Sequence, residues 1–196
     1  SIPVAKERGI ISQEMHPVIA VRAFGTKERL DYMHVPSEKE TERIRAILAL
    51  NDAIALVALE LHKKLSEFSM QDYLEWFTQT LGNQVARIRN FGAYHGHLHL
   101  QNITLDCRIT DLDGILAVKK IFSTKYQYAN LKKRLREKEL TPEIIYRSEF
   151  EGAKESLDDF LHDVEKLTGA ISQEDVQKYL HIFEEEYNDE LRRKVN

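Results

Sequence analysis

The chain has little cysteine, proline and glycine, and these shortages exclude several protein classes. Its 196 residues include one cysteine, four prolines and eight glycines. The single cysteine, Cys107, cannot form an internal disulfide and fits a reducing compartment. The low glycine and proline content, with 42% hydrophobic residues, excludes collagen-like and broadly disordered chains and favours one folded domain.

Long apolar runs are also missing from the sequence. No stretch approaches the roughly 20 apolar residues that a membrane-spanning helix needs, and no signal-peptide pattern opens the chain. The first residue is Ser1 rather than Met, which leaves room for an upstream segment. We therefore expect a soluble cytoplasmic protein with no membrane partner.

An excess of positive charge is missing as well. The net charge is −4, with 28 Lys and Arg against 32 Asp and Glu, which argues against nucleic acid as a partner. Locally, residues 119–138 hold eight Lys and Arg against Glu137 alone, whereas residues 149–190 are mostly acidic. This segregation has two interpretations, either solvated helix faces or a basic face near a polyanionic partner.

Hydrophobic periodicity predicts a fold that is α+β and mainly α. Apolar residues recur at helical spacing in most of the chain, and the pattern gives way to short β-branched runs near the start and in the middle. The helix starts are marked by Ser37 followed by Glu40, by Ser69, and by Ser172 followed by Asp175. The expected helices are 37–65, 69–91, 115–138, 150–168 and 172–194, and the expected strands are 17–24, 103–105 and 108–110.

The residues at the two ends of the central hairpin indicate a metal site. Asn102 precedes the first short strand and Asp111 follows the second, so a tight hairpin would bring an amide oxygen and a carboxylate together. Asp113 adds a second carboxylate two residues later. Hard oxygen ligands suit Mg²⁺, which is usually held by one or two carboxylates and by substrate phosphates. The pattern therefore predicts a metal-bound nucleotide and transfer of a phosphorus-containing group.

The same segment resembles a known catalytic loop. Residues 94–103 read YHGHLHLQNI, and residues 111–114 read DLDG. This arrangement resembles the catalytic and metal-binding loops of the protein-kinase-like superfamily, closest to aminoglycoside phosphotransferases, and the approach in residues 84–96 also resembles selenoprotein O, an adenylyltransferase. The resemblance implies a helical large lobe at residues 36–196 with a catalytic-type loop at 94–114, and a remnant of the small lobe and hinge at residues 1–35.

The resemblance assigns roles to individual residues. It implies that Asn102 and Asp111 bind the Mg²⁺ that bridges the phosphates of ATP, with Asp113 assisting. His95 would shape the loop. Position 97, where related phosphotransferases carry a catalytic Asp, is a histidine, and a neutral His97 could act as the base because its ordinary pKa is near physiological pH.

The start of the chain supplies the expected nucleotide-binding residues. Lys6 follows Val4 and Ala5 in a pattern similar to the kinase strand that carries a phosphate-pairing lysine. Arg22 lies on the expected strand 17–24 and could also reach a phosphate. A Gly-rich phosphate loop is missing from the sequence, which implies a partial or missing small lobe. The acceptor, a protein or a small molecule, is not specified by the sequence.

Two other functions remain open at this stage. A carboxylate base is also missing at position 101, where selenoprotein O has Asp and this chain has Gln, so a non-catalytic pseudokinase that binds nucleotide or scaffolds a partner is one alternative. The other is a Zn or Fe enzyme, because His95, His97 and His99 alternate and would face one side of an extended strand.

Overall fold

The structure is a computed structural model that describes residues 29–36, 39–112 and 115–193. The described residues are mainly helical with one two-stranded antiparallel sheet, which confirms the expected α+β, mainly α class. No helix within these ranges has the length and apolar character that crossing a bilayer requires. The elements in chain order are η1 (Leu30–Met33), α3 (Glu40–Glu60), η2 (Leu65–Glu67), α4 (Met70–Asn90), β1 (Ala93–Tyr94), η3 (Leu100–Asn102), β2 (Leu116–Ala117), α5 (Val118–Ser123), α6 (Lys125–Leu135), α7 (Pro142–Thr168) and α8 (Gln173–Arg193).

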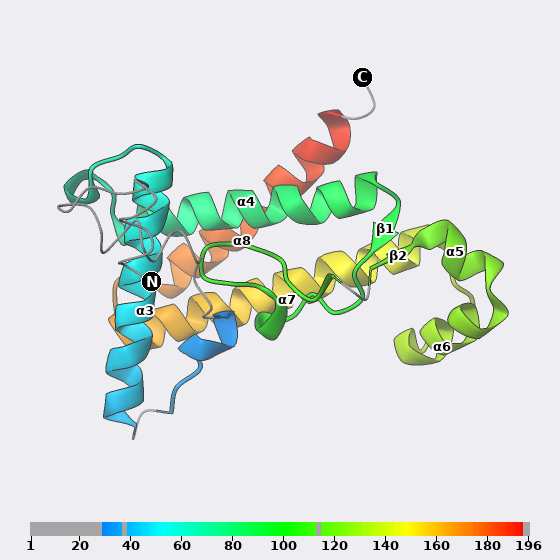
Figure 1. Cartoon of the computed structure of the whole chain (residues 1–196), viewed down its shortest axis with the longest axis horizontal. Coiled ribbons are helices and arrows are strands. Elements are labelled where there is room, and N and C mark those ends of the chain that lie inside the picture. Colours follow the sequence, from blue (N-terminus) through cyan, green and yellow to red (C-terminus); the bar gives the residue numbers. More distant parts are fainter. Residues whose placement is uncertain (1–28, 37–38, 113–114, 194–196) are drawn as a thin grey trace, which may run out of the picture.

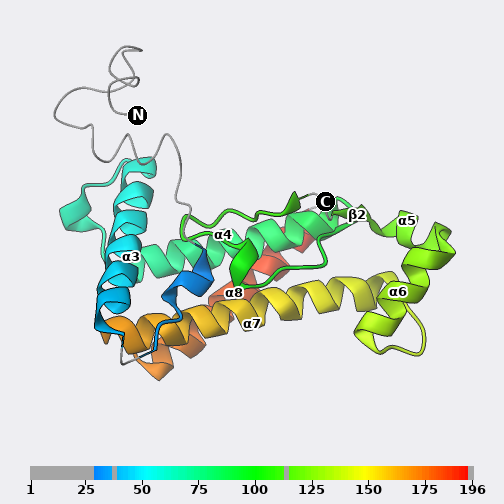
Figure 2. The ribbon, with the colours of Figure 1, turned by 60° about the horizontal axis from the view of Figure 1, so that its bottom comes forward.

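Three long helices form the body of the molecule. Helices α4, α7 and α8 pack together, while α3 crosses one end of this group and α5 and α6 lie at the opposite end (Figures 1 and 2). The chain between β1 and β2 returns along the body between these two ends (Figure 1). His95, His97, Asn102 and Asp111 therefore lie on a segment supported by the longest helices.

The main core lies between the long helices and is rich in aromatic rings. Phe77 of α4 packs against Phe160 of α7, with ring centroids 5.2 Å apart, and Phe150 of α7 stacks on Phe183 of α8 at 5.3 Å. Leu30 and Met33 are also fully buried in this core. The part of the expected segment 1–35 that is described thus packs with the helical body, and residues 1–28 lie outside the described ranges.

A second, smaller core ties α5 and α6 to the body. Val118 and Ile121 of α5 and Leu131 of α6 are buried together with Tyr94 of β1 and Ile145 of α7. This cluster places α6 beside the segment that follows β1, which becomes important for the site.

The predicted helix starts are confirmed where a serine caps the helix. At α4 the Ser69 side chain accepts a hydrogen bond from the Asp72 amide, and the Asp72 carboxylate accepts one from the Ser69 amide, so the capping box is complete. Ser172 and Asp175 make the same pair of contacts before α8. Reciprocal bonds of this kind satisfy amides that a helix N-terminus leaves without partners.

Other predicted boundaries are wrong. Helix α3 begins at Glu40, with Lys39 as an N-cap that makes no side-chain bond, and it ends at Glu60 rather than near Leu65, so the capping box expected from Ser37 and Glu40 is not the start of this helix. The strand predicted at residues 17–24 lies outside the described ranges.

The helices predicted at 115–138 and 150–168 also differ from the structure. The first is two helices, because Thr124 takes an extended conformation with φ −119° and ψ 104° between α5 and α6. The second starts earlier, at Pro142: the Thr141 side chain caps it by accepting from the Ile144 amide, and proline is favoured at the first helical position because its missing N–H is not needed there.

The sequence pattern also missed the two-stranded sheet. Strands β1 and β2 pair antiparallel, Ala93 with Ala117 and Tyr94 with Leu116. Two residues per strand carry too little alternation to be recognised as a strand. This pairing brings the two ends of the segment 93–117 together, and the loop and the central hairpin lie between the two strands in the chain.

Candidate functional site

The site segment begins where α4 ends. The chain turns at Gly92, whose φ of +68° an L side chain rarely adopts, and enters β1 directly. After β1 the segment from His95 to His99 has no regular secondary structure and leads into the short turn η3. The loop is thus anchored at one end by α4 and β1 and at the other by the central hairpin.

The central hairpin is formed by fewer contacts than two full strands. Ile103 and Ile109 make one antiparallel bridge, and the Cys107 amide donates to the Thr104 carbonyl at the turn. The hairpin is held from outside by the Leu30 amide, which donates to the Ile103 carbonyl at 2.9 Å. The predicted hairpin is therefore present, with a single bridge in place of the two three-residue strands.

Asn102 and Asp111 lie at the same end of this hairpin. The Thr110 amide donates to the Asn102 carbonyl at 2.8 Å, so Asp111 follows directly after the residue that pairs with Asn102. Asn102 is buried, and its Nδ2 donates to the His97 carbonyl at 2.9 Å. This bond engages the Nδ2 nitrogen of Asn102. No donor among the described residues reaches the Oδ1 oxygen, which is therefore left for another partner.

The chemistry of this end of the hairpin fits a hard cation. Asp111 is exposed, has φ +59°, and accepts no hydrogen bond from the described residues. The Thr110 hydroxyl next to it is buried and has no partner within the same ranges. The Asn102 amide, the Asp111 carboxylate and the Thr110 hydroxyl each offer an oxygen atom, and oxygen is the ligand type that Mg²⁺ requires. Asp113, Lys6 and Arg22 lie outside the described residues.

His95 is tied into the loop by both of its ring nitrogens. Its Nε2 lies 2.8 Å from the Thr110 carbonyl, which can only accept, so this nitrogen carries the hydrogen. Its Nδ1 accepts from the His97 amide at 3.3 Å. The ring is buried, and it therefore joins the loop to the second strand of the hairpin. Both ring nitrogens are engaged within the loop and the hairpin, so neither is available for catalysis.

A carboxylate that the sequence analysis missed fixes the loop from the other side. Glu149 of α7 is buried, and it accepts hydrogen bonds from the His95 amide at 2.7 Å and from the Gly96 amide at 3.1 Å. Burial raises the pKa of the Glu149 carboxyl, while these two amides and the charge of Arg134 partly offset the shift. The signal in the sequence is that Glu149 lies four residues from both Ile145 and Ala153, within the buried face of α7.

His97 and Arg134 form a contact pair at the edge of the loop. The Arg134 guanidinium of α6 lies 3.3 Å from His97 Nε2, donates to the Tyr94 hydroxyl, and stacks over the Tyr94 ring at 5.5 Å. A guanidinium has only donors, so His97 Nε2 accepts in this arrangement and its lone pair is engaged. The base role predicted for His97 would thus require Arg134 to move away from it.

The three alternating histidines do not gather around one point. The segment is an irregular loop rather than the extended strand that the alternation would need, and His95 is directed at the Thr110 carbonyl. The exposed rings of His97 and His99 have centroids 6.1 Å apart. Among the residues described, no three or more His, Cys, Asp or Glu side chains are grouped so that they could hold a metal ion.

A cavity of about 270 Å³ opens beside the loop, between its first residues and the helices α5 and α6. Tyr94, His95, Gly96 and His97 form one wall, and Arg134 lies at its edge. This cavity does not include Asn102 or Asp111 in its lining. His95 lines the cavity and also bonds to the Thr110 carbonyl, so this ring lies between the cavity and the hairpin end.

Comparison with known proteins adds no further information on this arrangement. No family model, no curated protein and no solved structure matches the chain. The functional interpretation consequently depends on the residues and geometry described above.

Proposed function

We propose that the chain is a kinase-like transferase that uses ATP and Mg²⁺ to move a phosphoryl or adenylyl group to a protein or small-molecule acceptor. The observation that carries the proposal is the backbone hydrogen bond from Thr110 to Asn102, which sets Asn102 and Asp111 at the same end of the hairpin, beside the unpartnered Thr110 hydroxyl. The resemblance of residues 94–114 to the loops of kinase-like enzymes supports the same function.

The chain itself supplies positioning rather than covalent chemistry. Asn102 Oδ1 and the Asp111 carboxylate would hold the metal, which when bound neutralises the charge of the nucleotide phosphates. Asn102 is oriented by its bond to the His97 carbonyl, and the loop that contains His97 is held by His95 and Glu149. Such prior orientation removes much of the reorganisation that transfer would otherwise require.

In this proposal the acceptor attacks the phosphorus without help from a carboxylate base. Positions 97 and 101 are His and Gln, and the lone pair of His97 Nε2 is engaged by Arg134. Phosphoryl transfer depends mainly on alignment and charge neutralisation, so a site of this composition can turn over, though slowly.

The absence of a carboxylate base at positions 97 and 101 favours one alternative function. If an activated acceptor is essential, the missing carboxylate makes the chain a pseudokinase-type protein that binds Mg²⁺·ATP or scaffolds a partner without turnover. ATP labelled at the α- or γ-phosphate separates these cases when the protein is incubated with Mg²⁺ and candidate acceptors. Movement of the γ label indicates phosphoryl transfer, and movement of the α label indicates adenylyl transfer.

The decisive variant for activity is Asp111→Asn, which keeps the shape of the side chain and removes its charge. We expect label transfer to fall at least about 100-fold, the scale seen when one electrostatic contact to the transition state is lost. Binding of Mg²⁺·ATP without movement of either label supports the pseudokinase. Absence of both binding and transfer rules out the proposal.

A further inference from the structure

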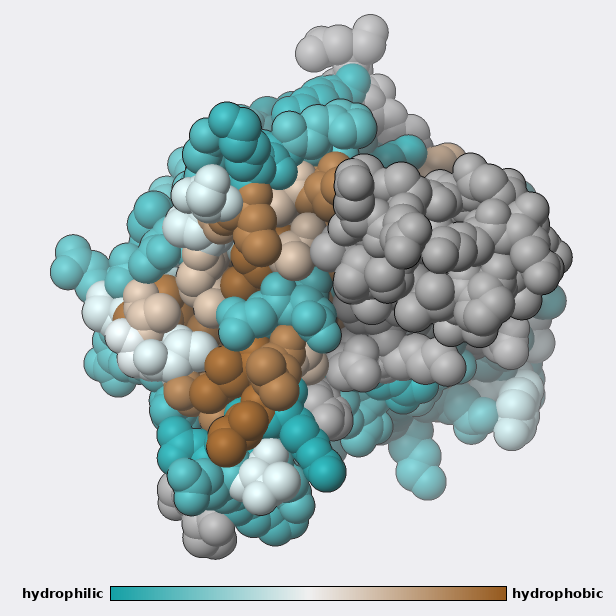
Figure 3. Space-filling model, turned by 60° about the vertical axis from the view of Figure 1, so that its left-hand side comes forward, coloured by the Kyte–Doolittle hydropathy of each residue, from teal (hydrophilic) through white to brown (hydrophobic). Residues whose placement is uncertain are grey.

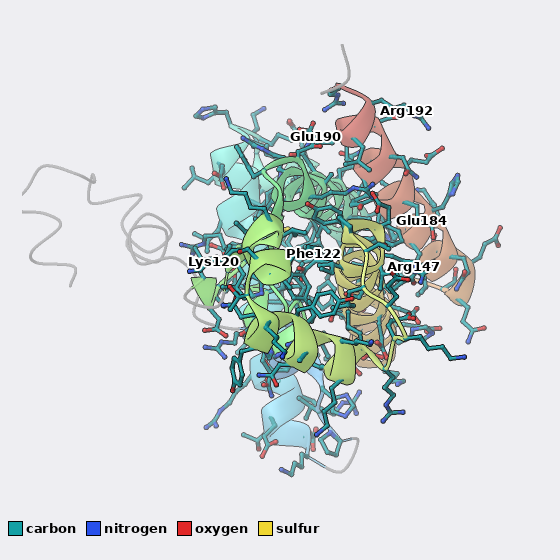
Figure 4. The ribbon with its side chains drawn as sticks, turned by 90° about the vertical axis from the view of Figure 1, so that its right-hand side faces the viewer. Lys120, Phe122, Arg147, Glu184, Glu190 and Arg192 are labelled. Carbon is teal, nitrogen blue, oxygen red and sulfur yellow. The ribbon has the colours of Figure 1, made fainter. Side chains whose placement is uncertain are left out.

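The cavity beside the loop is built for a small ligand. It lies at the end of the molecule that carries α5 and α6, which Figure 4 views directly, and its volume is about 270 Å³. Small-molecule sites typically measure roughly 300–1,000 Å³, so this cavity admits a compact molecule and excludes a folded protein surface. Leu116, Ile121 and Leu131 supply apolar contacts in its lining.

One polar atom of the lining lacks a partner. The Oε1 oxygen of Gln127, on α6, is buried and accepts no hydrogen bond from the described residues. A buried acceptor left without a donor costs free energy that a suitable partner would recover. A ligand in the cavity with a hydroxyl or amine hydrogen would supply the missing donor.

The charged residue of the lining also lacks a counter-ion. Arg134 donates to the Tyr94 hydroxyl and to His97 Nε2, neither of which carries a negative charge, and it forms no ion pair with a described carboxylate. Its charge does reach Glu149, where it partly offsets the effect of burial, but that carboxylate is occupied by the two loop amides. A guanidinium has five N–H donors, so Arg134 retains donors for an anionic group.

We propose that this cavity binds a small molecule with an anionic group, a hydroxyl or amine donor and a short apolar body. Arg134 binds the anion, which is a carboxylate or a phosphate, Gln127 accepts from the donor, and Leu116, Ile121 and Leu131 contact the apolar part. Because His97 lines the same cavity, the occupant is the acceptor of the transfer, an assignment that rests on the proposed function.

The transfer step then has a defined balance. The acceptor oxygen or nitrogen forms a bond to the transferred phosphorus, and the phosphorus–oxygen bond to the leaving group breaks. The leaving group is ADP in phosphoryl transfer and pyrophosphate in adenylyl transfer, and the acceptor proton passes to solvent. No oxidant or reductant is required.

Binding is tested first without nucleotide, by ligand-observed NMR on the full chain. One arm is a set of small hydroxy and amino acids that includes 4-hydroxyphenylacetate, and the other is a set of phosphate monoesters that includes 4-hydroxyphenyl phosphate. Phenylacetate lacks the donor, and methyl 4-hydroxyphenylacetate lacks the charge. We expect at least one arm to bind, and each matched analogue to bind about 10-fold more weakly or worse, as the loss of one charge-assisted hydrogen bond implies.

Four variants locate the binding. Arg134→Ala and Gln127→Leu are expected to weaken it about 10-fold or more, Arg134→Lys to weaken it less, and Lys133→Ala, at the exposed neighbouring position, to leave it unchanged. Circular dichroism shows whether each variant is folded. The inference is overturned if neither arm binds, if the uncharged ester binds equally well, or if Lys133→Ala is as harmful as Arg134→Ala.

The two proposals fail in different ways. If the acids or phosphate esters bind as predicted but Mg²⁺·ATP does not, the proposed transferase is wrong and the cavity assignment stands. If Mg²⁺·ATP binds while neither arm binds, only the cavity assignment is wrong. Asp111→Asn separates the two sites, because it is expected to abolish transfer and to leave binding in the cavity unchanged.

Discussion

Glu149 is the residue that holds the loop in place most directly. Its carboxylate accepts from two consecutive loop amides, and it is buried on α7. Glu149→Gln replaces one acceptor oxygen with a donor that faces those amides, so we expect the free energy of unfolding to fall by about 1–3 kcal/mol, the cost of leaving a buried donor unsatisfied. Urea denaturation measures the difference, and Glu151→Gln, an exposed position on the same helix, is the control.

The pKa of Glu149 determines how the difference in unfolding free energy between the wild type and Glu149→Gln depends on pH. Burial raises this pKa above its ordinary value of 4.5, so the folded state binds the proton more tightly than the unfolded state. As the pH rises from 4.5 through the raised pKa, the folded state loses stability relative to the unfolded state. The stability advantage of the wild type over Glu149→Gln is therefore largest near pH 4.5 and smaller at pH 7. An advantage that grows with pH would contradict this account.

Gly96 is the second residue on which the loop depends. Its φ is +84°, and an added Cβ would lie 3.1 Å from the Tyr94 ring and 3.2 Å from Arg134 Nη2. Gly96→Ala is expected to lower the free energy of unfolding by about 2 kcal/mol or more and to displace Arg134. Gly169→Ala is the matched control, because its φ is +62° and no atom lies within 4 Å of the added Cβ. A thermal melt that shows equal losses in both variants would contradict the predicted crowding at Gly96.

At the scale of elements, the start of α7 determines where Glu149 lies. Thr141 caps this helix by accepting from the Ile144 amide, and Pro142 begins it. Thr141→Ala is expected to lower the free energy of unfolding by about 1 kcal/mol, and Thr141→Ser, which retains the hydroxyl, by much less. Chemical denaturation of the two variants measures the difference. Equal losses would mean that the hydroxyl does not cap the helix.

The sequence predicts the elements whose ends carry local signals. The serine caps of α4 and α8 are short-range features, and the structure confirms them. The break between α5 and α6 at Thr124 has no such local signal. It allows Ile121 and Leu131 to pack into the same small core. That requirement depends on tertiary packing, which a single sequence does not reveal.

The candidate site follows the same division. The placement of Asn102 and Asp111 at the same end of the hairpin was predictable because few residues separate them along the chain. The contacts of Glu149 and Arg134 were not, since these side chains come from helices 53 and 37 residues away along the chain. The alternation of His95, His97 and His99 was misleading, because its interpretation assumed a strand where the chain forms a loop.

At the scale of the whole molecule, the burial of α3 differs sharply between neighbouring positions. Apolar side chains gather on the α3 end of the molecule (Figure 3), where Ile44 and Leu48 are 52% and 57% exposed, while Leu50 is fully buried. Leu50→Ala is expected to lower the free energy of unfolding by about 2–5 kcal/mol, the usual cost of a cavity in a packed core. Leu48→Ala is expected to change it by about 0.5 kcal/mol or less. Urea denaturation checks both, and similar losses would show that α3 is packed differently.

The packed core and the hydrogen-bonded loop together hold the end of the hairpin that carries Asn102 and Asp111. Helices α4 and α7 fix the loop through β1, His95 and Glu149, and the His97 carbonyl of the loop accepts from Asn102 Nδ2. His95 lines the small cavity and bonds to the Thr110 carbonyl beside Asp111, so one ring joins the cavity to the candidate metal site. Under the proposed function, nucleotide at the hairpin end and acceptor in the cavity would meet at this part of the loop.

The most direct test of the central claim is a calorimetric titration of the protein with ATP, with and without Mg²⁺. We predict binding that requires Mg²⁺, a loss of affinity of about 10-fold or more in Asp111→Asn, and affinity unchanged in His99→Ala, whose imidazole is exposed. Binding that is independent of Mg²⁺, or that survives in Asp111→Asn and disappears in His99→Ala, would contradict the assignment of Asn102 and Asp111 as the metal-binding pair.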